Sequence, residues 1–166
     1  NINLNSGALH VEPLRQAVLD AGADLGVALD GDADRAIFVS KRGAVVDGDA
    51  VLLMTARHLL QRGELSGPGG KPAVVSTVMS NLGLERALAK DGIHMPRTPV
   101  GDKYVLEEMR RIGAVLGGEQ SGHVIFHNYA TTGDGLLTTL RVLEVMLAAG
   151  RGPDELTSDL ERYPQR

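Results

Sequence analysis

Residues 25–40 of the chain read LGVALDGDADRAIFVS, two apolar runs separated by an acidic hexapeptide. The runs at 25–29 and 36–40 have the length and the aliphatic composition of buried β-strands. A loop that directly follows a buried strand lies at the edge of a sheet, where ligands collect in α/β proteins. We therefore expect a strand–loop–strand unit whose loop carries the chemistry of the protein.

The loop carries Asp30, Asp32 and Asp34 at alternate positions and ends in Arg35. In an extended chain such positions point to the same side, so the three carboxylates are expected to converge. Hard oxygen ligands suit Mg2+, and an adjacent guanidinium suits a phosphate. The loop thus predicts metal-dependent phosphate chemistry, with the three aspartates as Mg2+ ligands and Arg35 as a catalytic phosphate contact.

A calcium loop of the EF-hand type is the main alternative for an acidic segment of this kind. That loop requires glycine at its sixth position and glutamate at its twelfth. Counted from Asp30, those positions hold Arg35 and Lys41, so the pattern excludes an EF-hand. A solvated Asp- and Gly-rich turn without a ligand is the remaining structural interpretation.

The rest of the chain alternates between strand and helix patterns. Helices are expected over 13–23, 47–61, 80–91, 102–112, 132–149 and 153–162, and extended segments over 44–47, 73–77, 93–100, 114–118 and 123–126. This alternation predicts an α/β fold of two units with mixed, mostly parallel sheets. The Gly- and Pro-rich segment 63–72 is expected to separate the units, which divides the chain into 1–66 and 67–166.

In the helix expected over 132–149, apolar residues recur at helical spacing. Leu136, Leu140, Leu143 and Leu147 are separated by four, three and four residues and are expected to be buried.

Composition limits the classes of function. Apolar residues make up 43% of the chain and charged residues 23%, as in a protein with an ordinary core. The net charge of −4 and the scattered basic residues argue against nucleic acid as a partner. No apolar stretch has the roughly 18 residues of a membrane span. The chain has no cysteine, which excludes disulfides and thiolate zinc sites within it.

A second polar loop follows the strand expected at 114–118. Residues 117–123 read GGEQSGH, in which the glycines allow a tight turn and close approach of a ligand. The carboxylate of Glu119, the hydroxyl of Ser121 and the imidazole of His123 suit the hydroxyl groups of a sugar. In the alternative interpretation, these side chains hydrogen-bond only to the backbone of their own loop.

Lys103 lies in the first turn of the helix expected over 102–112. Free backbone amides and the helix dipole favour an anion at such a position. Lys103 is therefore a candidate for binding phosphate or transferring a proton, and the alternative is an exposed lysine without a functional role.

Together these motifs resemble the α-D-phosphohexomutase superfamily and, within it, the bacterial phosphoglucosamine mutase branch. The metal loop of that family, D-G-D-x-D-R, matches residues 30–35, and its sugar loop, G-E-x-S-G-H, matches residues 118–123. The elements V-G-D-[RK]-Y-V at 100–105 and T-T-G-D-G at 131–135 are similar to the glucosamine branch. Lys103 stands where this branch more often has arginine, which keeps the charge but loses bidentate phosphate geometry.

The resemblance implies a cytoplasmic enzyme of four domains that interconverts glucosamine 6-phosphate and glucosamine 1-phosphate through a phosphoserine and a bisphosphorylated intermediate. In that scheme, 1–66 is the later part of domain 2 and 67–166 is domain 3. Arg35 steadies the phosphoserine, and Glu119 and Ser121 hold the sugar, with His123 beside them.

Because the chain begins without Met and ends at Arg166, we expect a piece of a larger protein that is inactive without domains 1 and 4. Interdomain faces left exposed predict that the piece self-associates.

Two alternatives remain open. The first is a phosphomannomutase or phosphoglucomutase of the same superfamily. The second is a module that binds a sugar phosphate or a metal without catalysing a reaction.

Overall fold

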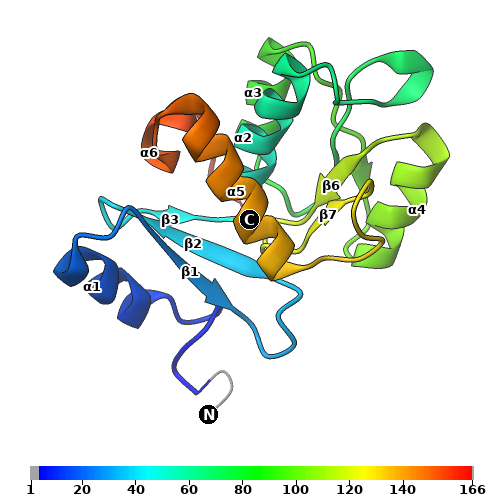
Figure 1. The fold of residues 1–166 in the computed structure, drawn as a ribbon. Helices are drawn as coiled ribbons and strands as arrows, with labels where there is room; N and C mark the ends of the chain where they lie inside the picture. Colours follow the sequence, from blue (N-terminus) through cyan, green and yellow to red (C-terminus); the bar gives the residue numbers. More distant parts are fainter. Residues whose placement is uncertain (1–3, 166) are drawn as a thin grey trace.

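The computed structural model describes residues 4–165. Its N-terminal part contains α1 (Glu12–Ala21), β1 (Leu25–Leu29), β2 (Ala36–Ser40) and β3 (Val45–Val46). The strands form an antiparallel sheet in the order β1-β2-β3, with α1 packed against β1 and β2 (Figure 1). The antiparallel arrangement differs from the mostly parallel sheets expected for both units. The links between these strands are far shorter than the dozen or so residues that a parallel crossover needs.

The rest of the chain contains α2 (Gly48–Gln61), the 3-10 turn η1 (Pro68–Gly70), β4 (Val75–Thr77), α3 (Leu82–Lys90), β5 (Arg97–Thr98), α4 (Asp102–Ile112), β6 (Leu116–Gly118), β7 (Val124–Phe126), α5 (Gly135–Ala149) and α6 (Pro153–Leu156). Its sheet has the order β5-β4-β6-β7, in which β4 pairs in parallel with β5 and β6, while β7 is antiparallel. The predicted α/β class is confirmed. Among residues 4–165, no helix is long and apolar enough to cross a membrane.

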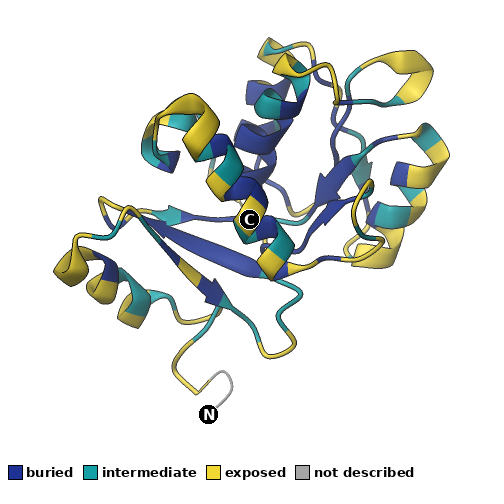
Figure 2. Ribbon diagram, viewed as in Figure 1, coloured by how far each residue is buried: buried dark blue, intermediate teal, exposed yellow. Residues whose placement is uncertain are grey.

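Helix α2 lies between the two sheets and contacts α3, α5 and β6. Most of its residues are buried, and a single apolar cluster joins Phe38 of β2 to Leu52 of α2 and Leu116 of β6 (Figure 2). The helix therefore connects the metal loop, which precedes β2, to the loops of the second sheet. The division at 66/67 stays a prediction.

The leucines of α5 are not buried. The exposed fractions of Leu136, Leu140, Leu143 and Leu147 are 64%, 58%, 38% and 83%, so the prediction of a buried stripe is wrong. The opposite side of α5, with Thr138, Arg141, Val142 and Val145, faces the core instead. Spacing identifies residues that share a face of a helix, but it does not say whether that face has something to pack against.

Candidate functional site

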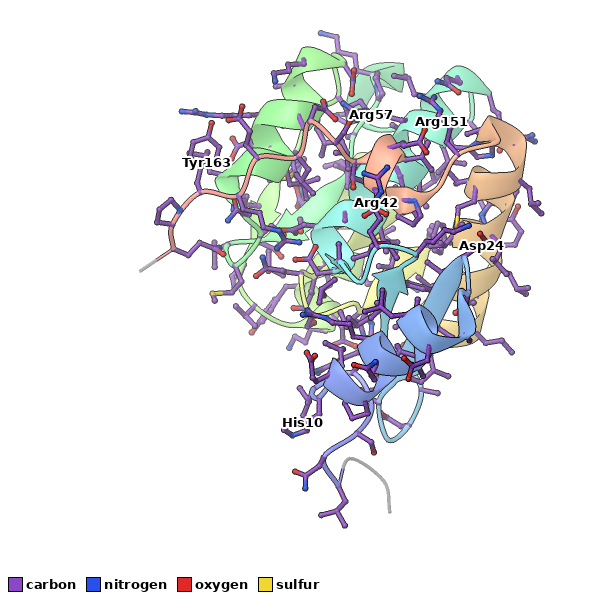
Figure 3. All side chains as sticks on the ribbon, turned by 90° about the vertical axis from the view of Figure 1, so that its left-hand side faces the viewer. His10, Asp24, Arg42, Arg57, Arg151 and Tyr163 are labelled. Atoms are coloured by element: carbon purple, nitrogen blue, oxygen red, sulfur yellow. The ribbon has the colours of Figure 1, made fainter. Side chains whose placement is uncertain are left out.

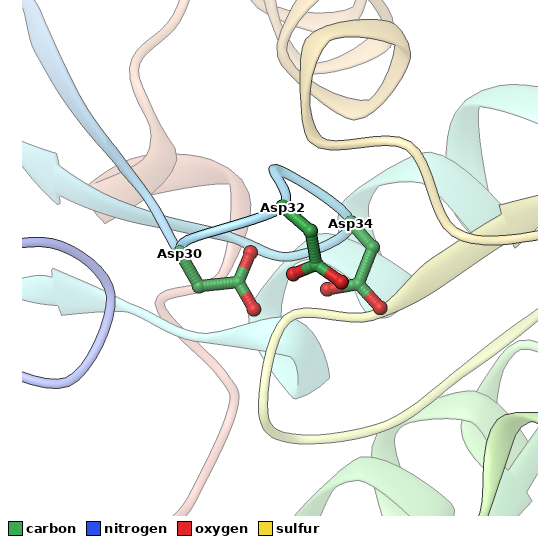
Figure 4. A group of neighbouring side chains, drawn as sticks. All are labelled: Asp30, Asp32 and Asp34. Atoms are coloured by element: carbon green, nitrogen blue, oxygen red, sulfur yellow. The ribbon is translucent and has the colours of Figure 1, made fainter. Parts of the chain in front are cut away.

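The three aspartates of the metal loop converge. One carboxylate oxygen from each of Asp30, Asp32 and Asp34 lies within 4.8 Å of the others (Figure 4). The loop reaches this arrangement by turning: the Ala33 N–H donates to the Asp30 carbonyl at 3.2 Å, and Ala33 has a φ of 60°. A left-handed conformation costs a residue other than glycine about 1–2 kcal/mol. The Gly135 N–H donates to the Ala33 carbonyl at 2.8 Å, which holds the residue in this conformation.

The electrostatics of the cluster fit a cation. Burial raises the pKa of Asp34, and its carboxylate neighbours Asp30 and Asp32 raise it further, whereas His123 lowers it. Asp34 Oδ1 is buried and has no hydrogen-bond partner among residues 4–165. A divalent ion bound by these oxygens relieves the repulsion and supplies the missing partner, so the donor set suits Mg2+.

Arg35 contributes one bond to the loop and keeps its side chain available. Its backbone N–H donates to Asp30 Oδ1 at 3.1 Å. Its Nε lies 3.7 Å from Asp30 Oδ2 and 3.8 Å from Asp34 Oδ1, and the side chain is 42% exposed. The guanidinium therefore sits beside the aspartates with a face open to solvent, where a phosphate can reach it.

His123 joins the two polar loops. It is 3% exposed, its Nδ1 lies 3.0 Å from Asp34 Oδ2, and its Nε2 accepts a hydrogen bond from the Gly133 N–H at 2.9 Å. Because Nε2 accepts, Nδ1 carries the proton and donates to Asp34. Both ring nitrogens are thus engaged within the protein, and His123 orients a carboxylate of the metal loop.

Glu119 connects the sugar loop to the start of α4. Its Oε1 accepts a hydrogen bond from the Gly101 N–H at 3.0 Å, and Ser121 Oγ lies 3.5 Å from its Oε2. Ser121 is exposed and Glu119 is partly exposed, so both side chains are open to a ligand. The sugar loop is also tied to β2, since the Ala36 N–H donates to the Gly122 carbonyl at 3.1 Å.

Lys103 lies on the first turn of α4, two residues after Gly101. Its Nζ lies 5.0 Å from the centre of the Tyr104 ring, in a cation–π arrangement. The side chain is exposed and forms no ion pair among the described residues. The Glu119–Gly101 bond places the start of α4, and with it Lys103, next to the sugar loop.

The start of α2 anchors the sugar loop, and the sequence alone did not reveal this role. The Gly48 N–H donates to the Gln120 carbonyl at 3.0 Å. The Asp49 carboxylate accepts hydrogen bonds from the Asn81 N–H at 2.8 Å and from Gln120 Nε2 at 3.2 Å. The only signal in the sequence is the polar run Asp47-Gly48-Asp49 at the start of a largely apolar helix.

Asp49 makes stability dependent on pH. Burial raises its pKa from the ordinary 3.8 to about 6. Between those values the folded protein keeps a proton that the unfolded chain has released, so stability falls as pH rises from about 4 to about 6. Replacing Asp49 by asparagine removes this loss, which is on the order of 3 kcal/mol.

Urea unfolding of wild type and Asp49→Asn at pH 4, 5, 6 and 7 measures the effect. The difference in unfolding free energy is expected to shift in favour of the variant as pH rises. A difference that stays constant over this range contradicts the assignment.

The comparisons with known proteins agree with this geometry. The family model described as "Phosphoglucomutase/phosphomannomutase, alpha/beta/alpha domain III" matches residues 47–163. A phosphoglucosamine mutase of Solibacter usitatus is 67% identical over 166 residues, which are 100% of this chain and 36% of that relative. One of Desulforudis audaxviator is 53% identical and matches 99% of this chain and 36% of its own length. The chain therefore spans about a third of the length of these relatives.

Solved structures share the fold. A phosphoglucomutase/phosphomannomutase family protein from Burkholderia thailandensis superposes with a TM-score of 0.80 at 28% identity, over 95% of this chain and 33% of that one. Aspergillus fumigatus N-acetylphosphoglucosamine mutase, in a complex with GlcNAc-6P and magnesium, superposes with a TM-score of 0.75 at 21% identity, over 99% of this chain and 38% of that one.

Proposed function

Because the chain belongs to the phosphoglucomutase/phosphomannomutase family, we propose that it forms the metal-binding and sugar-recognition part of a phosphoglucosamine mutase. The intact enzyme interconverts glucosamine 6-phosphate and glucosamine 1-phosphate through a phosphoserine and a bisphosphorylated intermediate. The observation that carries this proposal is the junction of the two polar loops, where His123 donates to Asp34. The 67% identity with a phosphoglucosamine mutase supports the choice of an amino sugar.

Asp30, Asp32 and Asp34 hold Mg2+ in this proposal. When bound, the ion neutralises charge on phosphoryl oxygens and so favours transfer of the group. Arg35 adds a second positive charge beside the cluster and binds the phosphate from its exposed side. His123 fixes the orientation of Asp34, and the engagement of both its ring nitrogens within the protein supports this positioning role over a direct contact with the sugar.

Glu119 and Ser121 bind sugar hydroxyls from the loop next to the metal cluster. The Gly101 N–H binds one carboxylate oxygen of Glu119, and the other, which lies 3.5 Å from Ser121 Oγ, is shared between that hydroxyl and the ligand. Lys103 binds a phosphate of the substrate from the first turn of α4. The phosphoserine and the remaining phosphate contacts come from polypeptide outside this chain, so the 166-residue chain alone is expected to be inactive.

The experiment is a coupled assay of the complete polypeptide on glucosamine 1-phosphate, mannose 1-phosphate and glucose 1-phosphate at equal concentrations, with Mg2+. A kcat/KM highest for glucosamine 1-phosphate is expected. Preference for a neutral sugar supports a phosphomannomutase or phosphoglucomutase instead. Binding without turnover of any of the three supports a non-catalytic module. Turnover by residues 1–166 alone contradicts the proposal that the phosphoserine comes from polypeptide outside this chain.

A further inference from the structure

The residues that follow α6 cross the surface of the protein and lie against the starts of α2 and α3. Residues 157–165, here called the C-terminal strap, form no helix or strand. Arg57 of α2 fastens the beginning of the strap, because its guanidinium donates to both carboxylate oxygens of Asp159 at 2.7 Å. From there the strap runs to Tyr163 (Figure 3). Backbone without secondary structure needs other partners for its polar groups, and the contacts of the strap show where they are.

Asn81, the N-cap of α3, holds the strap by its backbone. Its Oδ1 accepts a hydrogen bond from the Tyr163 N–H at 2.9 Å, and its Nδ2 donates to the Tyr163 carbonyl at 2.8 Å. Gly83 allows the strap to come this close, since a Cβ there would lie 1.6 Å from the Glu161 carbonyl oxygen. Asn81 is buried, so this pairing is made away from water.

The same asparagine connects the strap to the sugar loop. The backbone N–H of Asn81 donates to Asp49 Oδ2 at 2.8 Å, and that oxygen also accepts a hydrogen bond from Gln120 Nε2 at 3.2 Å. Gln120 lies between the two side chains assigned to the sugar. A first route of hydrogen bonds therefore leads from Tyr163 to the side chain of Gln120.

A second route begins at the neighbouring residue of the strap. Arg162 Nη1 donates to Asp47 Oδ2 at 2.7 Å, and Asp47 Oδ1 caps α2 by accepting from the Ala50 N–H at 3.1 Å. The next residue, Gly48, donates its N–H to the Gln120 carbonyl at 3.0 Å. The two routes thus hold both the side chain and the backbone of Gln120. The Arg162 side chain is 52% exposed, so it can be replaced without opening the core.

We propose that Arg162 and Asn81 are positioning residues for the sugar loop, which they hold by fixing the C-terminal strap against α2 and α3. Fixing Gln120 at two points sets the place of Glu119 and Ser121 on either side of it, and binding side chains must be held to within about 0.5 Å. This role rests on the proposed function, in which the sugar loop binds the substrate. Loss of either positioning residue should therefore weaken sugar binding more than it slows turnover.

Three variants of the complete polypeptide test the proposal. Arg162→Gln removes the charge that pairs with Asp47, whereas Arg162→Lys keeps it and can still reach with a single donor. Asn81→Ser removes both bonds to Tyr163 but keeps an N-cap for α3, because serine is about as good as asparagine at that position. Arg111→Gln is the matched control, since the side chain of Arg111 bonds only to Glu108 among residues 4–165.

Two measurements are made on each variant. Steady-state kinetics on glucosamine 1-phosphate separate KM from kcat. Hydrogen exchange, followed by mass spectrometry on peptides that cover residues 117–123, reports on the loop without requiring activity. Peptides from the rest of α2 and from α4 show whether the whole fold has loosened.

We expect Arg162→Gln and Asn81→Ser to raise KM about 2–30-fold, with kcat changed less than about twofold. Exchange in the sugar loop should become at least about threefold faster, while exchange in α4 stays unchanged. Arg162→Lys and Arg111→Gln should behave like wild type. The double variant Arg162→Gln/Asn81→Ser should exceed either single variant, because it breaks both routes.

Wild-type KM and wild-type exchange of the sugar loop in both variants overturn the proposal. Exchange that accelerates equally in α4, α2 and the loop means that the strap only stabilises the fold, and this result overturns it as well. If the wild-type enzyme prefers a neutral sugar or shows no turnover, the proposed function fails. The exchange of the sugar loop then still decides whether the strap holds it.

Discussion

Replacing Asp32 by asparagine is expected to remove most of the thermal stabilisation that Mg2+ gives the complete polypeptide. At a Mg2+ concentration 100 times its Kd, binding stabilises the folded state by about 2.7 kcal/mol. For a cooperative unit of about 150–250 residues, that corresponds to about 5–10 °C in Tm. Losing even an indirect partner of a metal site costs about 10–100-fold in affinity, and a ligand should cost at least as much. A 100-fold loss leaves about 0.4 kcal/mol at the same concentration.

Asp32 is chosen because its replacement removes a metal ligand without breaking another interaction of the loop. Its side chain is exposed and makes no hydrogen bond among residues 4–165, whereas Asp30 and Asp34 hold Arg35 and His123. Without Mg2+, the variant should be no less stable than wild type, because one of three mutually repelling charges has gone.

Scanning calorimetry over a Mg2+ titration at constant ionic strength measures both effects. Asp24→Asn is the control, since Asp24 is exposed and pairs with Lys41 at 3.2 Å, far along β1 from the metal loop. It should keep the full Mg2+ shift. If Asp32→Asn gains as much Tm as wild type at each concentration, the aspartate cluster is not the metal site.

Gly48→Ala is expected to destabilise the protein by about 1–3 kcal/mol and to raise the KM for the sugar phosphate. A Cβ at Gly48 would lie 1.9 Å from the Glu119 carbonyl oxygen and 2.9 Å from the Gly122 nitrogen. Both are backbone atoms of the sugar loop, so the start of α2 and this loop must separate. The gain in helix propensity, about 1 kcal/mol, is smaller than the cost of the clash.

Gly152→Ala is the matched control for this substitution. Gly152 has a φ of −82° before α6, and an added Cβ there meets no atom within 4 Å. It should leave stability unchanged or raise it by up to about 1 kcal/mol, by restricting the unfolded chain. Urea unfolding gives the stabilities, and steady-state kinetics of the complete polypeptide give KM. A Gly48→Ala protein with wild-type stability and KM would show that the contact between α2 and the sugar loop is dispensable.

Local patterns predicted most of the elements well, because each depends on residues that are neighbours in the chain. The apolar runs at 25–29 and 36–40 are strands with those limits, and the helix expected over 102–112 is α4. The convergence of the aspartates was predicted for an incomplete reason. An extended chain was expected to align them, but a turn with Ala33 in the left-handed region brings them together.

Local sequence patterns could not predict the roles of His123 and Gly48. His123 was expected beside the sugar, yet it contacts Asp34, 89 residues away, and Gly133. Gly48 gives no signal of its own, because its importance comes from a carbonyl oxygen on a distant loop. Such contacts depend on how the sheets pack through α2, which is a property of the whole core.

The order of residues was enough to place an acidic loop after a buried strand, a glycine-rich polar loop after another, and a leucine stripe along α5. These features follow from periodicity, backbone preference and the cost of grouping like charges. Which of them meet, and which stay open, followed from packing across the chain. The same leucine spacing suits a buried or an exposed face, and only the position of the core shows that it faces outward. Hydrophobic burial has no direction of its own, so the surfaces available in the folded chain decide where it acts.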